Sequence, residues 1–274
     1  MRTTVTILAA VLAVALAIAA CDGTDNEFSP GPGVNPGPGS DLNPGPGSDF
    51  NPGPQSVSER ISGSGTVTTE THQVTGFDRI ELAGEGRVIV TIGDDPGLTI
   101  RTDDNLHEYL EATVSNRTLV LATRGEGAFD VDPTDSVTWT VETPQVAGLR
   151  LSGAGFISAG GLASDRLEVA VSGAGDVELT DLDTSHFRAA LSGVGIITAS
   201  GTADSVELEL TGVGDIDTEN LEAATGVLSI TSAGNVIVTA TDSLDVDATG
   251  LGTVTVHGSP TVTGDTDRVT HATG

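Results

Sequence analysis

Two glycine-rich turns end in an aspartate and could supply oxygen ligands to a calcium ion. They read Gly173-Ala-Gly-Asp176 and Gly212-Val-Gly-Asp215, and carboxylate oxygens are ligands that calcium prefers. In calcium-binding β-rolls the glycine–aspartate repeat recurs about every nine residues, whereas here Ile196 takes the aspartate's place in the intervening turn. We expect Asp176 and Asp215 to lie two strand spacings, about 10 Å, apart. One calcium ion cannot bridge that gap. A calcium-responsive structural module is therefore kept only as an alternative hypothesis.

A second pair of carboxylates could perform glycoside hydrolysis, which needs two carboxyl groups about 5–10 Å apart in a groove. Glu178 and Asp217 are the nearest candidates, because we expect both on one outward row with Thr198 between them. Outward carboxylates are common on so acidic a chain, and only 3% of the residues are aromatic, which leaves few side chains to stack on sugars. A polysaccharide hydrolase or lyase is therefore a further alternative, and we assign no catalytic residue.

The histidines show neither the spacing of metal ligands nor a Ser/His/Asp pattern. They are His72, His107, His186, His257 and His271. We interpret them as surface or turn residues. The sequence therefore predicts no cofactor, and no metal site beyond the alternative at Asp176 and Asp215.

A turn that recurs about every twenty residues predicts the strands and turns that would position these residues. The structural turn residues are Gly153, Gly155, Gly173, Gly175, Gly193, Gly195, Gly212, Gly214, Gly234, Gly250 and Gly252. The second glycines of successive turns are 20, 20, 19, 20 and 18 residues apart. A fixed period of this kind indicates stacked supersecondary units, and the strand before each turn alternates apolar with polar residues.

Three apolar stretches per repeat indicate a coil with three short sides. The first two precede and follow the turn, as in Leu167, Val169 and Val171, and then Val177 and Leu179. A third column lies seven residues past the second glycine and comprises Leu162, Leu182, Thr202, Leu221 and Thr241. The fold predicted is all-β, a parallel β-helix with about 20 residues per coil and a narrow interior. The same register would place Glu168, Arg188 and Glu207 side by side as an outward ladder of alternating charge.

Residues 57–150 are less regular and predict an N-terminal head with the first coils. The segments 77–82 and 88–92 flank Gly84-Glu-Gly86 and read as the first coil, followed by a strand over 98–101. A short helix is expected within 104–110. Asn116 lies in a predicted hairpin turn between strands over 112–114 and 118–122, and residues 137–141 alternate again. We expect this head to cover the open end of the stack, because an uncovered coil exposes strand edges.

The first 20 residues have the features of a signal peptide. Arg2 precedes an apolar run over residues 5–20 that is too short and alanine-rich for a spanning helix. Small residues stand directly before Cys21, the only cysteine of the chain, and this resembles the lipobox of bacterial lipoproteins. We predict lipidation of Cys21 and anchoring to a membrane through the lipid. The folded part then has no cysteine for disulfides or thiolate metal sites.

Residues 21–56 comprise the predicted lipidated cysteine and a disordered tether. The unit Asn-Pro-Gly-Pro-Gly-Ser-Asp starts at Asn35 and at Asn43, and it begins again at Asn51. Proline favours extended chain and glycine loosens it, so such a segment spans roughly 35 Å. The predicted organisation is therefore signal peptide 1–20, lipidated tether 21–56, head and first coils 57–150, and regular coils with a C-terminal cap 151–274.

The charge balance excludes two classes of partner. The 11 basic residues face 39 acidic ones, which gives a net charge of −28. Nucleic acid and a bare anionic membrane surface would both be repelled at long range. Such acidity is typical of a secreted protein that must stay soluble, and we expect no nucleic-acid partner.

Three features of the chain resemble the bacterial auto-transporter adhesin, head GIN domain family. They are a Phe-x-x-Ile strand from Phe77 to Ile80, the segment Asp103-Asp-Asn105-Leu, and the recurring Ser-Gly-x-Gly-Asp turns. The resemblance covers roughly residues 60–260. It implies a right-handed β-helical domain in the cell envelope without established catalytic residues. This chain departs from the usual turn at Ile196, Asn235 and Thr253, and at Ser232, which replaces the first glycine.

The interpretation is a non-enzymatic, exported and lipid-anchored envelope protein. Its location is expected to be the outer membrane or cell surface rather than the inner membrane. Its rigid β-helical surface would serve adhesion or interaction with envelope glycans or proteins.

Overall fold

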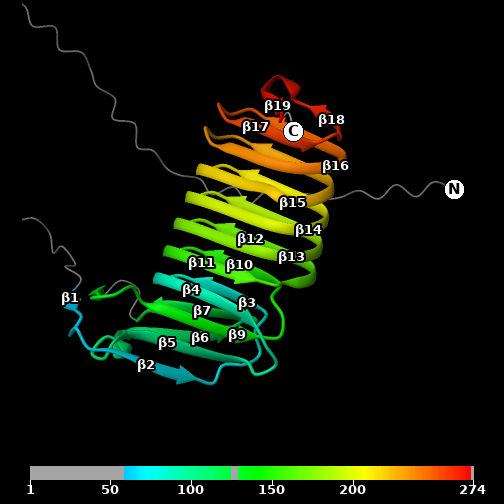
Figure 1. Cartoon of the computed structure of the whole chain (residues 1–274). Helices are drawn as coiled ribbons and strands as arrows, with labels where there is room; N and C mark the ends of the chain where they lie inside the picture. Colours follow the sequence, from blue (N-terminus) through cyan, green and yellow to red (C-terminus); the bar gives the residue numbers. More distant parts are fainter. Residues whose placement is uncertain (1–58, 125–128, 273–274) are drawn as a thin grey trace, which may run out of the picture. The chain divides into compact units, whose positions relative to one another are not determined.

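The computed structural model describes residues 59–124 and 129–272, and within them the chain winds into a β-helix (Figure 1). Strands lie in parallel on the strands of the coil before them, one repeat earlier in the sequence. Gly155 pairs with Gly175, for example, and Leu167 pairs with Phe187. The strands of the regular coils are β10 (Gly148–Leu151), β11 (Ala154–Gly160), β12 (Ala163–Val171), β13 (Ala174–Leu191), β14 (Val194–Leu210), β15 (Val213–Ile230), β16 (Asn235–Ala248) and β17 (Thr253–Gly258).

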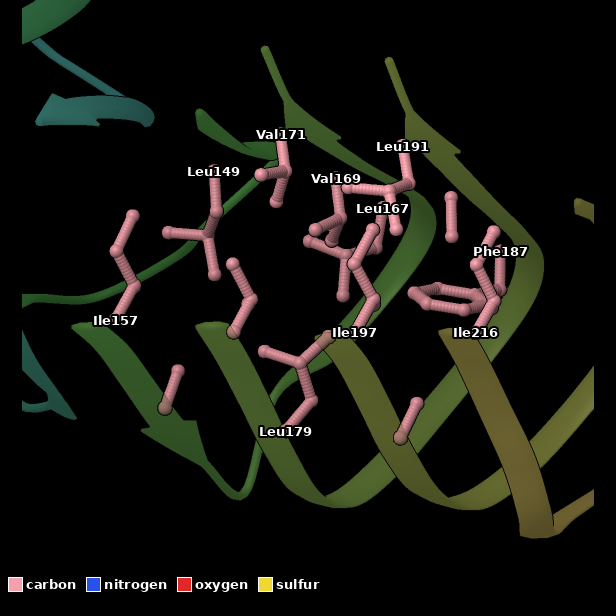
Figure 2. Close-up of a cluster of buried hydrophobic side chains, with 14 of the residues drawn as sticks. Leu149, Ile157, Leu167, Val169, Val171, Leu179, Phe187, Leu191, Ile197 and Ile216 are labelled. Atoms are coloured by element: carbon pink, nitrogen blue, oxygen red, sulfur yellow. The ribbon is translucent and has the colours of Figure 1, made fainter. Parts of the chain in front are cut away.

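The first two predicted apolar columns form the core. Leu167, Val169 and Val171 before the turn at Gly173 are fully buried, and so are Val177 and Leu179 after it. Figure 2 shows side chains from both sets directed into the space between the ribbons. Backbone hydrogen bonds between coils and shared burial of these columns stabilise each coil through its neighbours, because a lone twenty-residue coil could not bury enough apolar surface.

The third column is only partly as predicted. Leu162, Leu182 and Leu221 are buried, but Thr202 and Thr241 are exposed, so their assignment to the interior was wrong. The pairing slips at this corner, where Leu182 lies opposite Gly201 and Gly201 opposite Leu221. The coils of 19 and 18 residues are shorter than the usual 20 at this corner, and Thr202 and Thr241 consequently point outward.

Two strands that precede the regular coils form the first layer in continuous register with them. They are β3 (Arg79–Leu82) and β4 (Glu85–Ile92), which pair in parallel with β10 and β11. This is the predicted first coil, with its turn at Gly84-Glu-Gly86. The β3–β4 coil, β10 to β17 and the turns between them are called the stack below.

A cap covers the end of the stack below β3 and β4 (Figure 1). Its elements are β2 (Val67–His72), β5 (Gly97–Asp103), the 3-10 helix η1 (His107–Tyr109), β6 (Leu110–Ser115), β7 (Thr118–Thr123) and β9 (Thr138–Thr143). The strands β7 and β9 pair in parallel with β3 and β4, while β2, β5 and β6 pair antiparallel. The antiparallel pairs end the parallel stacking, as the predicted head requires.

Buried Asp103 at the end of β5 ties three segments of the cap together. Its carboxylate accepts hydrogen bonds from the backbone N–H of Gly65 at 2.8 Å, and from the backbone N–H and the hydroxyl of Thr134 at 2.9 and 2.7 Å. The Thr134 hydroxyl, followed by the backbone donors, lowers the pKa of Asp103 below its ordinary value of 3.8. A charged carboxylate is thus built into the cap.

Short elements complete the described chain. The strands β1 (Glu59–Ser62) and β8 (Phe129–Asp132) form a separate parallel pair. At the other end, β18 (Thr261–Gly264) pairs with β16 and β19 (Val269–His271) pairs with β17, and the 3-10 helix η2 (Thr266–Arg268) connects the two strands.

Candidate functional site

The turn glycines are structural because their backbones lie directly on one another. A Cβ on Gly173 would be 1.9 Å from the carbonyl oxygen of Gly153, and one on Gly175 would be 1.8 Å from the carbonyl oxygen of Gly155. Gly175 also has a φ of +137°, which a side chain would strain. Where Ser232 replaces the first glycine, strand pairing resumes only at Asn235, two residues later than in the preceding turn.

The two turn aspartates each bind the backbone of the next coil. The Asp176 carboxylate accepts the N–H of Ile196 at 2.9 Å. The Asp215 carboxylate accepts both the backbone N–H and the side-chain amide of Asn235, each at 2.9 Å. Ile196 lies opposite Asp215 and separates the two carboxylates by a full coil, as expected. In their observed positions these aspartates fasten successive turns.

Glu178, Thr198 and Asp217 occupy one outward row, as the register predicted. Two strand spacings separate the carboxylates, about 9.6 Å. A shallow surface cavity touches Glu178 together with Ser158 and Thr180, but its lining does not include Asp217. The row therefore supplies an exposed carboxylate, Glu178, and a half-buried one, Asp217, at the outer limit of a glycosidase pair, without a groove shared between them.

The histidines are not all surface residues. The His186 ring lies 2.7 Å from the Ser205 hydroxyl, and His257 lies 3.7 Å from Glu219. His72 and His107, however, both contact Glu70 in the cap, and the His107 side chain is only 7% exposed. The sequence could not bring these two together, because 35 residues and the strands β3, β4 and β5 separate them.

Arginines gather on one outward face of the β-helix. All three arginines among residues 148–264 lie there, namely Arg150, Arg166 and Arg188, and Arg79 joins them from β3. We call the outward side of the strands that precede the turns, from β3 to the C-terminal part of β15, the arginine face. Alternation along the strands predicts that these residues point outward. Their gathering on one face appears only once the register is known.

Two surface cavities lie on the arginine face. The first, of about 180 Å³, is lined by Arg79, Arg150 and Glu168 around Gly148 and Ala170. The second, of about 210 Å³, is lined by Arg166, His186, Arg188 and Glu207, among others. The outward columns hold glycine or alanine at 148, 170 and 190, and these small residues keep the surface between the arginines low.

The arginines of this face form partly exposed ion pairs. Arg79 reaches Glu168 at 3.6 Å across Gly148, Arg150 approaches Glu81 at 3.5 Å, and Arg188 binds Glu207 and Glu209. The predicted ladder of Glu168, Arg188 and Glu207 has the predicted register, but Glu168 bonds Arg79 instead of Arg188. Ion pairs that solvent reaches contribute little to folding, so their partners can be exchanged.

Other features bear on metals and membranes. Within residues 59–124 and 129–272, no three histidine, cysteine, aspartate or glutamate side chains stand so that they could hold a metal ion. No helix in this part of the chain is long and apolar enough to span a membrane. Cys21, the predicted signal peptide and the tether lie outside the described residues.

Residues 76–260 match the family described as "Putative auto-transporter adhesin, head GIN domain". The chain belongs to this family. The match spans the stack and most of the cap, and it confirms the resemblance carried by the Phe77 strand and the recurring turns. The description names an adhesin, a class of protein that acts at the cell surface. No curated protein is similar enough to count as a match.

Solved structures share the fold. A protein described as a putative adhesin from Bacteroides fragilis is 28% identical, with a TM-score of 0.69 over 74% of this chain and 93% of its own. A putative adhesin from Parabacteroides distasonis is 21% identical, with a TM-score of 0.59 over 78% of this chain and 98% of its own. A structure from the same species, described as a putative lipid binding protein, is 22% identical, with a TM-score of 0.56 over 75% and 95%. The last two show the fold alone.

Proposed function

We propose that this head GIN domain protein is a non-enzymatic, lipid-anchored envelope protein whose arginine face binds carboxylate or sulfate groups of surface glycans. The observation that carries the proposal is the gathering of Arg79, Arg150, Arg166 and Arg188 around two cavities of a chain with a net charge of −28. Guanidinium groups bind such anions through paired hydrogen bonds. The family description and the open, arginine-lined cavities both favour binding over catalysis.

The arrangement suits a linear polymer. Arg150 and Arg188 lie two coils apart, about 9.6 Å along the axis, and the two cavities follow one another in the same direction. Arg166 has no ion-pair partner within the described residues, so it can bind an anionic group without releasing a carboxylate. The rigid stack fixes these spacings, which reduces the ordering cost of binding.

A glycan panel tests the proposal. Acidic polysaccharides and their neutral analogues are immobilised, and binding of the purified protein is measured by surface plasmon resonance. We expect binding of acidic chains to fall at least about tenfold in the double variant Arg150→Gln/Arg166→Gln. The matched control is Arg60→Gln, because Arg60 is exposed on β1 and pairs with Asp130 away from this face. Equal binding by all three proteins would overturn the proposal.

The anchor is tested separately. We propose that Cys21 carries the lipid, because it follows an apolar run that ends in small residues. In a bacterial host, the protein should take up a labelled fatty acid and sediment with membranes, and Cys21→Ser should be unlabelled and soluble. Labelling of Cys21→Ser equal to that of the unchanged protein would contradict the anchor without affecting the glycan hypothesis.

A further inference from the structure

The cap contains a large cavity that the arginine face does not use. It has a volume of about 620 Å³ and lies between β2 and β6, against η1. Ile100 and Leu110, both buried, contribute to its wall. Most of its other lining residues are polar or ionisable, and they include two of the five histidines. The cavity is therefore a candidate site for a ligand that binds imidazole and carboxylate groups.

Strand β2 presents three polar side chains to the same side. Thr68, Glu70 and His72 alternate along the strand and so share one face. One carboxylate oxygen of Glu70 lies 3.6 Å from Nε2 of His72 and 3.7 Å from Nδ1 of His107. Glu70 thus stands next to two histidines that come from different elements.

One nitrogen of the His107 ring has a hydrogen-bond partner and the other has none. Its Nε2 is 3.0 Å from the hydroxyl of Thr68. Its side chain is only 7% exposed, and its Nδ1 is buried without a hydrogen-bond partner. A buried polar atom of this kind costs free energy unless a ligand satisfies it. The Thr68 contact directs Nδ1 toward Glu70.

We propose that Glu70, His72 and His107 bind a divalent transition-metal ion such as Zn²⁺. Ligand bonds of about 2.0–2.2 Å in tetrahedral geometry place ligand atoms about 3.4 Å from each other, close to the two separations from Glu70. As the side chains stand, they do not yet surround a common point. The proposed site requires His72, whose side chain is 44% exposed, to rotate so that the three ligands surround one point, with water as the fourth ligand.

The charges around the cavity favour a cation. Glu70, Glu108 and Glu111 line it, and Arg124 is the only arginine that does. With neutral histidines these groups sum to −2, which a divalent ion neutralises. Two imidazoles and a carboxylate select a transition metal over Ca²⁺ or Mg²⁺, which prefer all-oxygen sites.

Isothermal titration of the untagged, metal-stripped protein tests this inference. We expect Zn²⁺ to bind with a 1:1 stoichiometry and to raise Tm, whereas Ca²⁺ and Mg²⁺ should do neither. Glu70→Gln and His72→Gln should each weaken Zn²⁺ binding at least about tenfold. Both positions are exposed, so these variants should fold. Co²⁺ should give visible absorption bands that shift in His107→Gln.

The matched control is the double variant Glu219→Gln/His257→Asn. It removes a pair with the same 3.7 Å separation that has no second histidine within reach of its carboxylate in the described structure. Zn²⁺ binding should be unchanged in it. No Zn²⁺ binding by the unchanged protein, or equal binding in Glu70→Gln and His72→Gln, would overturn the metal site. Glycan binding by the arginine face does not depend on either outcome.

Discussion

The stack and the cap are stabilised in different ways, although β-strands build both. In the stack, each residue repeats the role of its equivalent one coil away, and buried apolar columns run along the axis. In the cap, single polar contacts join segments distant in sequence, as Asp103 does for Gly65 and Thr134. Contacts in the stack therefore repeat from coil to coil, while the cap adds unlike polar contacts to a buried apolar core that includes Leu119, Trp139 and Val141.

This difference also separates architecture from chemistry. A binding site that needs different side chains at one point forms less easily in the stack. Each coil there repeats the one before it, so side chains at equivalent positions lie in rows, one strand spacing apart. The stack accordingly offers rows, such as the arginine face. The cap, with its antiparallel strands and its 3-10 helix, brings Glu70, His72 and His107 together.

The largest expected effect comes from a turn glycine of the stack. Gly175→Ala places a Cβ 1.8 Å from the carbonyl oxygen of Gly155 at a φ of +137°. Backbone of two coils must separate to admit it, so we expect a loss of about 4 kcal/mol or more in the free energy of unfolding. Urea denaturation followed by circular dichroism measures this loss.

Gly161→Ala is the matched control for that clash. Gly161 also has a positive φ, of +68°, but nothing lies within 4 Å of its Cβ position. We expect a cost of only about 1 kcal/mol. Equal costs in the two variants would show that close stacking of the turns does not limit the fold, and that backbone strain alone explains the glycines.

An intermediate effect is expected at Asp103, where the cap depends on one charge. Its pKa is lowered by folding, so the folded state binds the proton less tightly than the unfolded chain does. The resulting stabilisation is complete above pH 3.8 and is lost as the pH falls through the lower pKa of the folded state. Asp103→Asn should lower Tm at neutral pH by roughly 5 °C.

The acid response distinguishes this from a general effect. Amide hydrogen exchange in β2 and β5 should accelerate below pH 3.8 in the unchanged protein, before exchange in β13 and β14 does. In Asp103→Asn the cap should already exchange faster at neutral pH and should respond less to acid. Simultaneous opening of cap and stack at every pH would show that the two regions form one cooperative unit.

The contrast between the regions also decides what the sequence could predict. The turn spacing and apolar alternation predicted the coils, the core columns and the hairpin at Asn116, because local patterns specify each of them. The predicted interior position of Thr202 was wrong, because its coil is one residue shorter and the register shifts at that corner. The glycine spacing shows that a residue is missing, but it does not show at which corner of the coil. The arginine face required the register, and the Glu70–His107 contact required the chain path through the cap.

The smallest expected effect lies on the arginine face. Arg188→Gln removes the ion pairs with Glu207 and Glu209, and we expect a change of about 0.5 kcal/mol in unfolding free energy. A double-mutant cycle with Glu207→Gln measures the coupling directly by urea denaturation, and added salt should reduce it. A coupling above about 2 kcal/mol would mean that these pairs hold the fold and cannot release arginines to a ligand. A small coupling leaves Arg188 free to exchange a carboxylate of its own chain for one on a glycan, because the stack is stabilised by its columns and not by its surface charges.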